Sequence, residues 1–345
     1  MTPHGTVTTG WHLPPKTGAP EALSVPPATV PRLRIAVLDD YQQAAETLAD
    51  WSVLEADIDF FPDHIADREQ LLSRLSGFEV VVAMRERTPF PRQVLGGLPD
   101  LKLLVTTGLA NPSIDVNAAS ELGIVVCGTG SLPHPTGELT MALILAMARG
   151  LVTEVDSVRD GGWQVGLGRD LLGSTLGVIG LGRLGSHVAR LGLAFGMEAL
   201  AWSQNLNRER ASEVGVIVVS KEELLRRSDF VTIHLKLSDR TRGLIGESEL
   251  ALMQPEAHLI NTSRGPIVDE TALLEAVQNG VIAGAALDVY DEEPLPAGHP
   301  FRSEPRILAT PHVGYVTRET YRVFYEGVVE AIAAWSDGEP IRLLT

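Results

Sequence analysis

The chain has 345 residues and a formal net charge of −16, with 44% hydrophobic and 21% charged residues. This length is sufficient for two domains with separate cores, and the composition is that of an ordinary globular protein. The acidic balance disfavours a nucleic-acid partner, because binding to a phosphate backbone requires a basic face. The longest apolar run, Met141 to Ala148, is too short to cross a bilayer, so no membrane segment is expected.

The N-terminal 31 residues differ in composition from the rest of the chain. They contain seven of the 22 prolines and show neither a periodic pattern nor a basic-then-apolar signal pattern. We therefore expect residues 1–31 to form a disordered, proline-rich tail. The single cysteine, Cys127, ends an apolar run and is predicted to be a buried thiol, which fits a reducing cytoplasm.

From residue 32 onward, segments typical of strands and helices alternate. Short apolar or β-branched runs bounded by turn residues predict strands, and periodic segments between them predict helices. The predicted strands are Arg34–Leu38, Val80–Ala83, Leu101–Val105 and Ile124–Cys127, and the predicted helices are Tyr41–Ala49 and Asp115–Leu122. These segments make a small α/β sheet, and a long helix is expected next, over residues 136–158.

A glycine-rich turn follows in the middle of the chain. The apolar segment Leu176–Ile179 predicts a buried strand, and a helical pattern begins at Arg183. Between them, Gly180 and Gly182 would allow a tight turn that brings bare backbone against a pyrophosphate, while Gly185 would allow the helix to pack closely on the strand. The strand–turn–helix context makes this a predicted dinucleotide site, which the isolated Gly166-Leu-Gly168 is not.

A second series of strands and helices begins at this turn. Its predicted strands are Glu198–Trp202, Val216–Val219, Phe230–Leu235, His258–Asn261, Ala283–Val289 and Ile307–Ala309. Two parallel sheets with crossover helices imply two α/β domains, each doubly wound. The position of the glycine turn predicts a dinucleotide-binding domain, 133–316, inserted into a second domain formed by 32–132 and 317–345. The last helix, Glu319–Trp335, should return to that second domain.

Three polar clusters follow strands of the second series. They are Asn261–Gly265, Asp288–Pro294 and Thr310–His312. Because the carboxyl ends of parallel strands share one sheet edge, a guanidinium, carboxylates and an imidazole should converge there. Redox chemistry on a 2-oxo acid needs this set: an arginine to bind the substrate, a histidine to move a proton and a carboxylate to orient the histidine.

In these segments the chain resembles the D-isomer-specific 2-hydroxyacid dehydrogenase family, which includes phosphoglycerate dehydrogenases and glyoxylate–hydroxypyruvate reductases. The resemblance covers nearly everything from Arg32 to Thr345. The matching segments are LGVIGLGRLG from Leu176, HLKL from His234, NTSRGPIVD from Asn261, ALDVYDEEPL from Ala286 and TPHVG from Thr310. The family fold is a Rossmann-type cofactor domain inserted into a flavodoxin-like substrate domain.

The resemblance implies roles for individual residues. Arg264 would bind the substrate, His312 would be the acid/base and Glu293 would be the carboxylate behind it. A carboxylate beside the imidazole favours its protonated form, so carbonyl reduction should be favoured toward lower pH. In the first domain, Arg85 would contact the substrate carboxylate.

The same resemblance implies further binding positions. The backbone amides of Leu109 and Ala110 would bind the substrate carboxylate, although Ala110 stands where the family usually has glycine. The implied cofactor-binding positions are Gly180, Gly182, Arg183, Leu184, Gly185, Ser203, His234, Leu235, Lys236, Thr262, Ser263, Asp288 and Gly314. Among these, Lys236 replaces the family's usual proline. No histidine or cysteine spacing suggests a metal site.

The choice between NAD and NADP stays open. NAD enzymes carry an acidic residue about 20 positions after the glycines to bind the ribose 2′-hydroxyl. Ser203 occupies that position here, so nothing would repel a 2′-phosphate, and Arg208 or Arg210 could approach it.

The resemblance leaves several functions to compare. The leading one is an NAD(P)-dependent reductase of small 2-oxo acids, with glyoxylate, hydroxypyruvate and 3-phosphohydroxypyruvate as candidate substrates. A non-enzymatic NAD-sensing protein, such as the related transcriptional corepressors, is the alternative. Formate dehydrogenases carry Gln in place of Glu293, and a methyltransferase would not explain Arg264 and His312. The family also implies a homodimer formed through the arm 136–158, with Trp163 reaching the other subunit.

Overall fold

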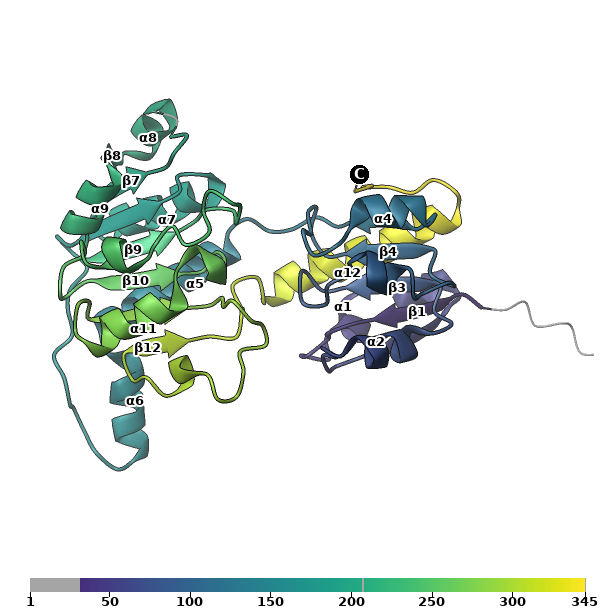
Figure 1. Ribbon diagram of the computed structural model, residues 1–345, viewed down its shortest axis with the longest axis horizontal. Helices are drawn as coiled ribbons and strands as arrows, with labels where there is room; N and C mark the ends of the chain where they lie inside the picture. Colours follow the sequence, from purple (N-terminus) through teal and green to yellow (C-terminus); the bar gives the residue numbers. More distant parts are fainter. Residues whose placement is uncertain (1–31, 207, 345) are drawn as a thin grey trace, which may run out of the picture. The chain divides into compact units, whose positions relative to one another are not determined.

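The structure is a computed structural model that describes residues 32–206 and 208–344. The expected disordered tail, residues 1–31, lies outside the described residues. Residues Leu33–Thr345 form one unit by their internal contacts, and within it the strands make two separate sheets (Figure 1). The domain limits at 132/133 and 316/317 stay a prediction.

The first sheet has five parallel strands in the order β2-β1-β3-β4-β5. This is the flavodoxin-like order that the family resemblance implies. The strands are β1 (Arg34–Val37), β2 (Asp57–Phe60), β3 (Val80–Ala83), β4 (Leu103–Thr106) and β5 (Val125–Gly128). Strand β2 was not predicted. It is a half-exposed edge strand, and its alternating Asp-Ile-Asp-Phe pattern is the signal that could have indicated it.

Helices and short helical turns connect and cover this sheet. They are α1 (Ala45–Leu48), the 3-10 helix η1 (Trp51–Leu54), α2 (Arg68–Leu75), α3 (Arg92–Leu95), α4 (Val116–Glu121) and α12 (Arg318–Ser336). The predicted helix 41–49 is confined to the single turn of α1, because Gln43 adopts a positive φ of 49° ahead of it. The C-terminal helix α12 packs against β4 and β5.

The second sheet has seven parallel strands in the order β12-β11-β10-β9-β6-β7-β8. Read from β8, this is the 3-2-1-4-5-6 order of the Rossmann fold with one further strand, and the strand order reverses between β6 and β9. The strands are β6 (Thr175–Ile179), β7 (Glu198–Trp202), β8 (Ile217–Val218), β9 (Phe230–Ile233), β10 (His258–Asn261), β11 (Gly284–Leu287) and β12 (Ile307–Ala309). Ligands in such sheets bind outside the carboxyl ends of the strands at the reversal point.

The helices of this part differ in whether a side chain caps their first turn. They are α5 (Pro135–Ala148), α6 (Leu151–Arg159), α7 (Arg183–Ala194), α8 (Arg208–Val214), α9 (Lys221–Arg227), α10 (Glu247–Leu250) and α11 (Glu270–Gln278), with 3-10 turns η2 (Gly265–Ile267) and η3 (Pro300–Arg302). Ser220 and Asp269 accept hydrogen bonds from the first turns of α9 and α11. The first turns of α5, α6 and α7, in contrast, have no side-chain cap.

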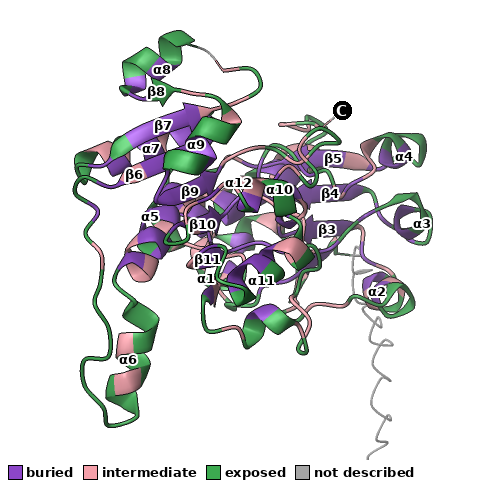
Figure 2. Ribbon diagram, turned by 60° about the vertical axis from the view of Figure 1, so that its left-hand side comes forward, coloured by how far each residue is buried: buried purple, intermediate pink, exposed green. Residues whose placement is uncertain are grey.

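Apart from the edge strands β2 and β8, the strands of each sheet are largely buried, as in parallel sheets whose two faces are covered (Figure 2). Successive residues of a strand therefore belong to different cores. On β1, Ile35 and Val37 pack on the same face as α12, whereas Ala36 faces the core under α2 and α4. On β10, Leu259 and Ile260 divide in the same way between two cores.

The predicted helix 136–158 is helical over most of its length, but it is not continuous, because the structure divides it into α5 and α6. Gly150 separates the two with a φ of 56°, a left-handed conformation that glycine adopts without steric cost. Helix α5 packs against β10, β11 and α7, but α6 has no buried residue. Figure 2 shows α6 as mostly exposed or intermediate.

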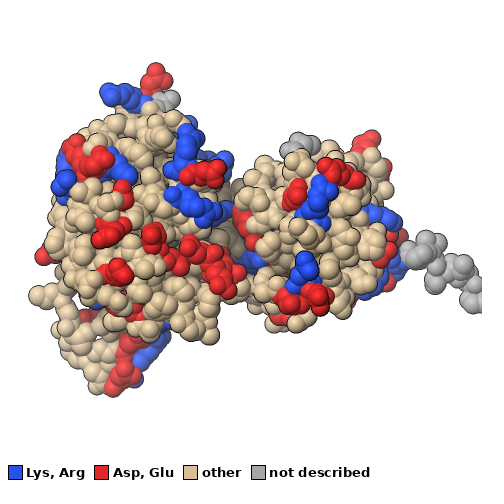
Figure 3. Space-filling view, viewed as in Figure 1, with Lys and Arg blue, Asp and Glu red and all other residues tan. Residues whose placement is uncertain are grey.

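The face that Figure 3 shows carries both acidic and basic side chains, in separate small groups. Among the described residues, no helix is long and apolar enough to cross a membrane. No group of three or more His, Cys, Asp or Glu side chains in that part of the chain is arranged to hold a metal ion.

Candidate active site

The glycine turn after β6 has the geometry that a dinucleotide site needs. Gly180 has a φ of 99°, and a Cβ there would lie 2.6 Å from the carbonyl oxygen of His234. A Cβ on Gly185 would lie 1.9 Å from the carbonyl oxygen of Gly180, so the close approach of helix and strand requires glycine at both positions. A Cβ on Gly182 would meet nothing within 4 Å. The protein's own packing therefore does not require glycine at Gly182, which leaves room for a ligand at the uncapped start of α7.

The other predicted cofactor positions surround this turn. Ser203 directly follows β7, whose Trp202 carbonyl accepts the N–H of Gly180 at 2.8 Å. His234 directly follows β9, and its own N–H bonds the carbonyl of Ile179 at 2.7 Å. These two residues thus lie on either side of the strand that carries the glycines.

A second group of predicted cofactor positions is linked by hydrogen bonds. The Ser263 hydroxyl donates to the carbonyl of Leu235, and the Thr262 hydroxyl meets that of Thr140 on α5 at 2.9 Å. The carbonyl of Gly314 accepts from Thr136 at 3.1 Å. Arg183 and Leu184 form the first turn of α7, and Lys236 is exposed beside Leu235.

His234 is a neutral imidazole near neutral pH. Burial lowers the pKa of His234 to about 3. Its Nε2 lies 3.0 Å from the Thr232 hydroxyl, whereas its buried Nδ1 has no hydrogen-bond partner in the described part of the chain. An unpartnered polar atom beside the glycine turn fits a site that a polar ligand completes.

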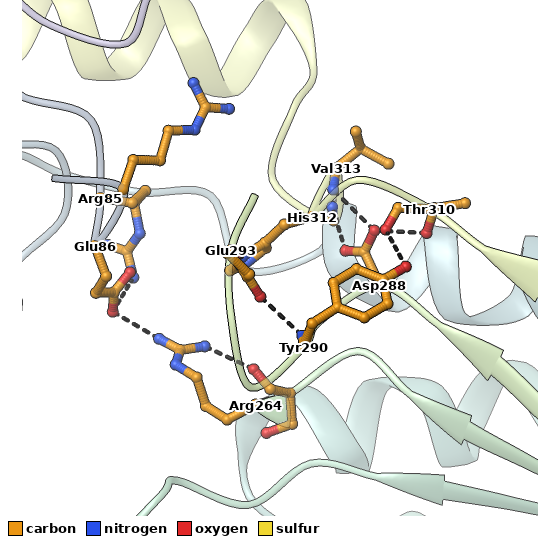
Figure 4. A network of polar contacts seen from close by, with 12 residues as sticks. Arg85, Glu86, Arg264, Asp288, Tyr290, Glu293, Thr310, His312 and Val313 are labelled. Atoms are coloured by element: carbon orange, nitrogen blue, oxygen red, sulfur yellow. Dashed lines mark hydrogen bonds and ion pairs between the residues drawn. The ribbon is translucent and has the colours of Figure 1, made fainter. Parts of the chain in front are cut away.

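His312 and Glu293 meet directly, although they come from different strand ends. Nδ1 of His312 lies 2.5 Å from Oε2 of Glu293. The second carboxylate oxygen of Glu293 accepts the backbone N–H of Tyr290 at 2.9 Å, so the carboxylate is held at both ends (Figure 4). Bonding through Nδ1 leaves Nε2 as the ring nitrogen for proton transfer.

Asp288 holds the segment that carries His312. Its carboxylate accepts the N–H groups of Val313 and Gly314, each at 2.8 Å, and the Thr310 hydroxyl at 2.6 Å. Asp288 is only 1% exposed, and this burial raises its pKa despite the three donors. His312 itself has a φ of 53°, a strained conformation for a non-glycine residue, and the bonds on either side of it maintain that conformation.

Arg264 contacts Glu86 and Ser263, not the pair formed by His312 and Glu293. Its Nη2 donates to Oε1 of Glu86 at 2.6 Å, and its Nη1 donates to the carbonyl of Ser263 at 2.7 Å. Glu86 follows β3, so this ion pair connects the carboxyl ends of strands from the two sheets (Figure 4). No hydrogen bond joins Arg264 to His312 or Glu293 among the described residues.

The predicted substrate positions of the first sheet lie close to this ion pair. Arg85 has a φ of 52°, its Nη2 lies 3.5 Å from Glu86, and its Nη1 donates to the Thr107 carbonyl at 2.9 Å. Asn111 donates to the Arg85 carbonyl at 2.6 Å. Leu109 and Ala110 lie between these anchors and are exposed.

The structure thus brings His312, Glu293 and Asp288 into one network, and Arg264 and Arg85 into a second one around Glu86. No role was predicted for Glu86. Its position in the Arg-Glu-Arg segment 85–87 was visible, but nothing in the sequence indicates that it pairs with a residue 178 positions away.

Comparisons with known proteins agree with this architecture. Residues 141–314 match the family described as D-isomer specific 2-hydroxyacid dehydrogenase, NAD binding domain. The chain is 43% identical to a glyoxylate reductase of Aeropyrum pernix over 256 residues, which make up 71% of this chain and 76% of that protein. The chain belongs to the D-isomer specific 2-hydroxyacid dehydrogenase family.

Two further relatives show how widely the likeness extends. A D-3-phosphoglycerate dehydrogenase of Archaeoglobus fulgidus is 37% identical over 80% of this chain, which spans only 53% of that protein. The crystal structure of a phosphoglycerate oxidoreductase from Vibrio cholerae O395 matches with a TM-score of 0.85 and 36% identity, covering 89% of this chain and 99% of that one.

These findings confirm the predicted family, the fold class and the cofactor class. The protein is an NAD(P)-dependent oxidoreductase of the 2-hydroxyacid dehydrogenase type. The non-enzymatic sensor, which the sequence left open, is not supported by these relatives. The individual roles of Arg264, Glu293 and His312 stay predictions.

Proposed function

We propose that this protein reduces small 2-oxo acids to D-2-hydroxy acids, with His312 as the acid/base, Glu293 as its positioning residue and Arg264 as the substrate-binding residue. The observation that carries the proposal is the pair formed by Nδ1 of His312 and Oε2 of Glu293 at 2.5 Å, at the same sheet edge as the glycine turn.

In the proposed reaction, His312 handles the proton. During reduction its protonated Nε2 donates to the carbonyl oxygen as that oxygen becomes a hydroxyl, and the neutral ring is then reprotonated from solvent. During oxidation the neutral Nε2 takes the hydroxyl proton. Glu293 holds the ring through Nδ1, while the Tyr290 N–H fixes the carboxylate.

Arg264 and the segment after β4 would bind the acid group of the substrate. A guanidinium forms paired hydrogen bonds with a carboxylate or carbonyl, which orients the reacting carbon. Arg85 and the backbone amides of Leu109 and Ala110 are the proposed additional contacts. The exposure of both residues supports this, because a substrate can reach this segment from solvent.

The residues present fit a dinucleotide. Gly182 and the uncapped first turn of α7 would hold the pyrophosphate, Ser203 would face the adenosine ribose, and His234 would line the same groove. The nicotinamide, when bound, supplies or accepts the hydride. We propose that NADP is accepted as well as NAD, because no carboxylate stands at Ser203.

The substrate class follows from the family and from the names of its members. Because the relatives include glyoxylate reductases and D-3-phosphoglycerate dehydrogenases, the proposed substrates are glyoxylate, hydroxypyruvate and 3-phosphohydroxypyruvate. The decisive experiment is a panel of these three acids with NADH and NADPH, followed by the absorbance of the reduced nicotinamide. We expect multiple turnovers and a D-configured product from hydroxypyruvate. Cofactor binding without turnover of any 2-oxo acid would contradict the proposal.

We also propose that the protein is a homodimer formed through α6. Four apolar residues of this helix are exposed: Leu151, Val152, Val155 and Val158. They lie on one side of the helix, and Trp163, which follows it, is 74% exposed. A second copy of the chain is the proposed partner. The proposed location is the cytoplasm, because the single cysteine, Cys127, is a buried free thiol.

A further inference from the structure

The carboxylate of Glu86 lies between two arginines of the proposed substrate site. Its Oε1 is 2.6 Å from Nη2 of Arg264 and 3.5 Å from Nη2 of Arg85 (Figure 4). The Glu86 side chain is 16% exposed and that of Arg264 is 34% exposed, so solvent screens this contact only in part.

We propose that Glu86 is an internal competitor of the substrate: its carboxylate occupies the two guanidinium groups that a 2-oxo acid must reach, and substrate binding displaces it. This inference rests on the proposed function, in which Arg264 and Arg85 bind the acid group. A carboxylate oxygen that meets both guanidinium groups is positioned as a bound substrate carboxylate would be.

An alternative role for Glu86 would be to orient Arg264, as Glu293 orients His312. The contacts favour competition, because each guanidinium is held by another acceptor. Nη1 of Arg264 donates to the carbonyl of Ser263 at 2.7 Å, and Nη1 of Arg85 donates to the carbonyl of Thr107 at 2.9 Å. Both arginines therefore keep a backbone anchor when Glu86 moves away.

The ionisation of Glu86 agrees with this role. Burial alone would raise the pKa of Glu86, but the charges of Arg85 and Arg264 outweigh it and the net pKa is lowered. Glu86 is therefore a carboxylate at neutral pH, with the same charge as the substrate carboxylate that would displace it. Its removal leaves two anchored cations without a counter-charge, which should attract a substrate anion more strongly.

The test compares wild type with two variants. Glu86→Gln keeps the size of the side chain but removes its charge, and Glu86→Ser has a side chain that is too short to contact Arg264. The probes are glyoxylate, through KM and kcat, and the unreactive carboxylate oxamate, through Kd from calorimetry in the presence of NADH. We expect both variants to lower KM and Kd by about three- to tenfold, with kcat unchanged within about twofold.

Glu121→Gln is the matched control. Glu121 pairs with Arg92 at the same N–O distance of 2.6 Å, but on the exposed surface between α3 and α4. This variant also removes one negative charge, and it should leave KM and kcat for glyoxylate and Kd for oxamate unchanged.

Two results would overturn the inference. One is an unchanged or raised KM and oxamate Kd in both Glu86 variants. The other is a fall in kcat at constant KM, which would make Glu86 a positioning residue for Arg264. Failure of the proposed function would appear differently, as absence of turnover by the wild-type protein. The oxamate titration tests Glu86 in that case also, because it needs no turnover.

Discussion

Nδ1 of His312 and Oε2 of Glu293 are 2.5 Å apart, although 19 positions separate the two residues in the chain. The pair forms because β11 and β12 are parallel neighbours, so the segments that follow them leave the same sheet edge. His312 has an unfavourable φ and Glu293 is exposed, so the Asp288 contacts and the Tyr290 N–H hold the two residues in place.

Replacement of His312 tests the acid/base assignment. His312→Ala removes the proton donor and should lower kcat for glyoxylate reduction by about 10²–10⁴-fold, the usual range for general acid catalysis. Steady-state kinetics measures the fall in kcat, and a separate cofactor titration measures cofactor affinity, which should be retained. Wild-type kcat in this variant would exclude His312 as the acid.

Replacement of Glu293 tests how His312 is positioned. Glu293→Gln keeps the size of the side chain but removes the negative charge beside Nδ1 of His312. It should lower kcat by about tenfold or more and change the pH profiles of reduction and oxidation. The exposed neighbour Glu292, changed to Gln, serves as the control and should keep the wild-type profile. Superimposable profiles for Glu293→Gln and wild type would contradict the positioning role.

Asp288 is predicted to stabilise both the fold and the site. Asp288→Asn leaves one of the N–H groups of Val313 and Gly314 without its acceptor, which should cost about 1–3 kcal/mol of unfolding free energy. The His312 segment should then be less well held, and kcat should fall. Thr310→Val, which removes only one donor to Asp288, should have a smaller effect on both quantities. Chemical denaturation and kinetics on the same samples provide the measurement.

The main parts of this site could be predicted from the sequence because the patterns that indicate them are local. The glycine turn, the buried strands and the polar clusters each lie within about ten residues, and parallel strand order brings the clusters to one edge. The break at Gly150 was a local signal as well, but the apolar pattern on both sides of it favoured one long helix. The short strand β2 was missed because an edge strand carries little apolar sequence.

Other features depend on contacts that no local pattern encodes. Asp288 binds the backbone of residues 313 and 314, and backbone groups carry no sequence signal. Glu86 pairs with Arg264 only because two sheets present their strand ends to each other. Sequence reasoning identifies the residue types of such a site, while charge pairing between distant segments requires the structure.

His258 is predicted to make stability depend on pH. Burial, with a contribution from the charge of Arg169, lowers the pKa of His258 to about 4, against about 6.5 in an unfolded chain. The unfolded state therefore binds the proton more readily. The contribution of His258 to stability is complete above pH of about 6.5 and is lost as the pH falls toward 4.

The measurement is the unfolding free energy across this pH window. His258→Phe keeps an aromatic ring at the position that stacks on Phe230. It should reduce the loss of unfolding free energy between pH of about 6.5 and 4 by on the order of 1–2 kcal/mol. The exposed His134, changed to Gln, is the control and should leave the slope unaltered. An unchanged slope in His258→Phe would refute the assignment.

Ser203 is predicted to determine whether NADPH is accepted. Ser203→Asp would place a carboxylate at the end of β7, where it would repel a 2′-phosphate and accept the ribose hydroxyl of NAD. The ratio of kcat/KM for NADPH to that for NADH should fall by about 10–100-fold. Ser212→Asp adds the same charge on the exposed side of α8 and should keep the ratio. A wild-type protein that already rejects NADPH would contradict the proposed cofactor range.

The dimer is predicted to depend on the apolar side of α6. Val155→Asp with Val158→Asp places two charges on α6, which has no buried residue in the described part of the chain, so the fold should be retained while association is lost. Light scattering after size exclusion should give the mass of a dimer for wild type and of a monomer for the variant. Val53→Asp, at a valine that is 60% exposed on η1, should leave the dimer intact. If the α6 variant stays dimeric, the interface lies elsewhere on the chain, and the exposed apolar side of α6 needs another explanation.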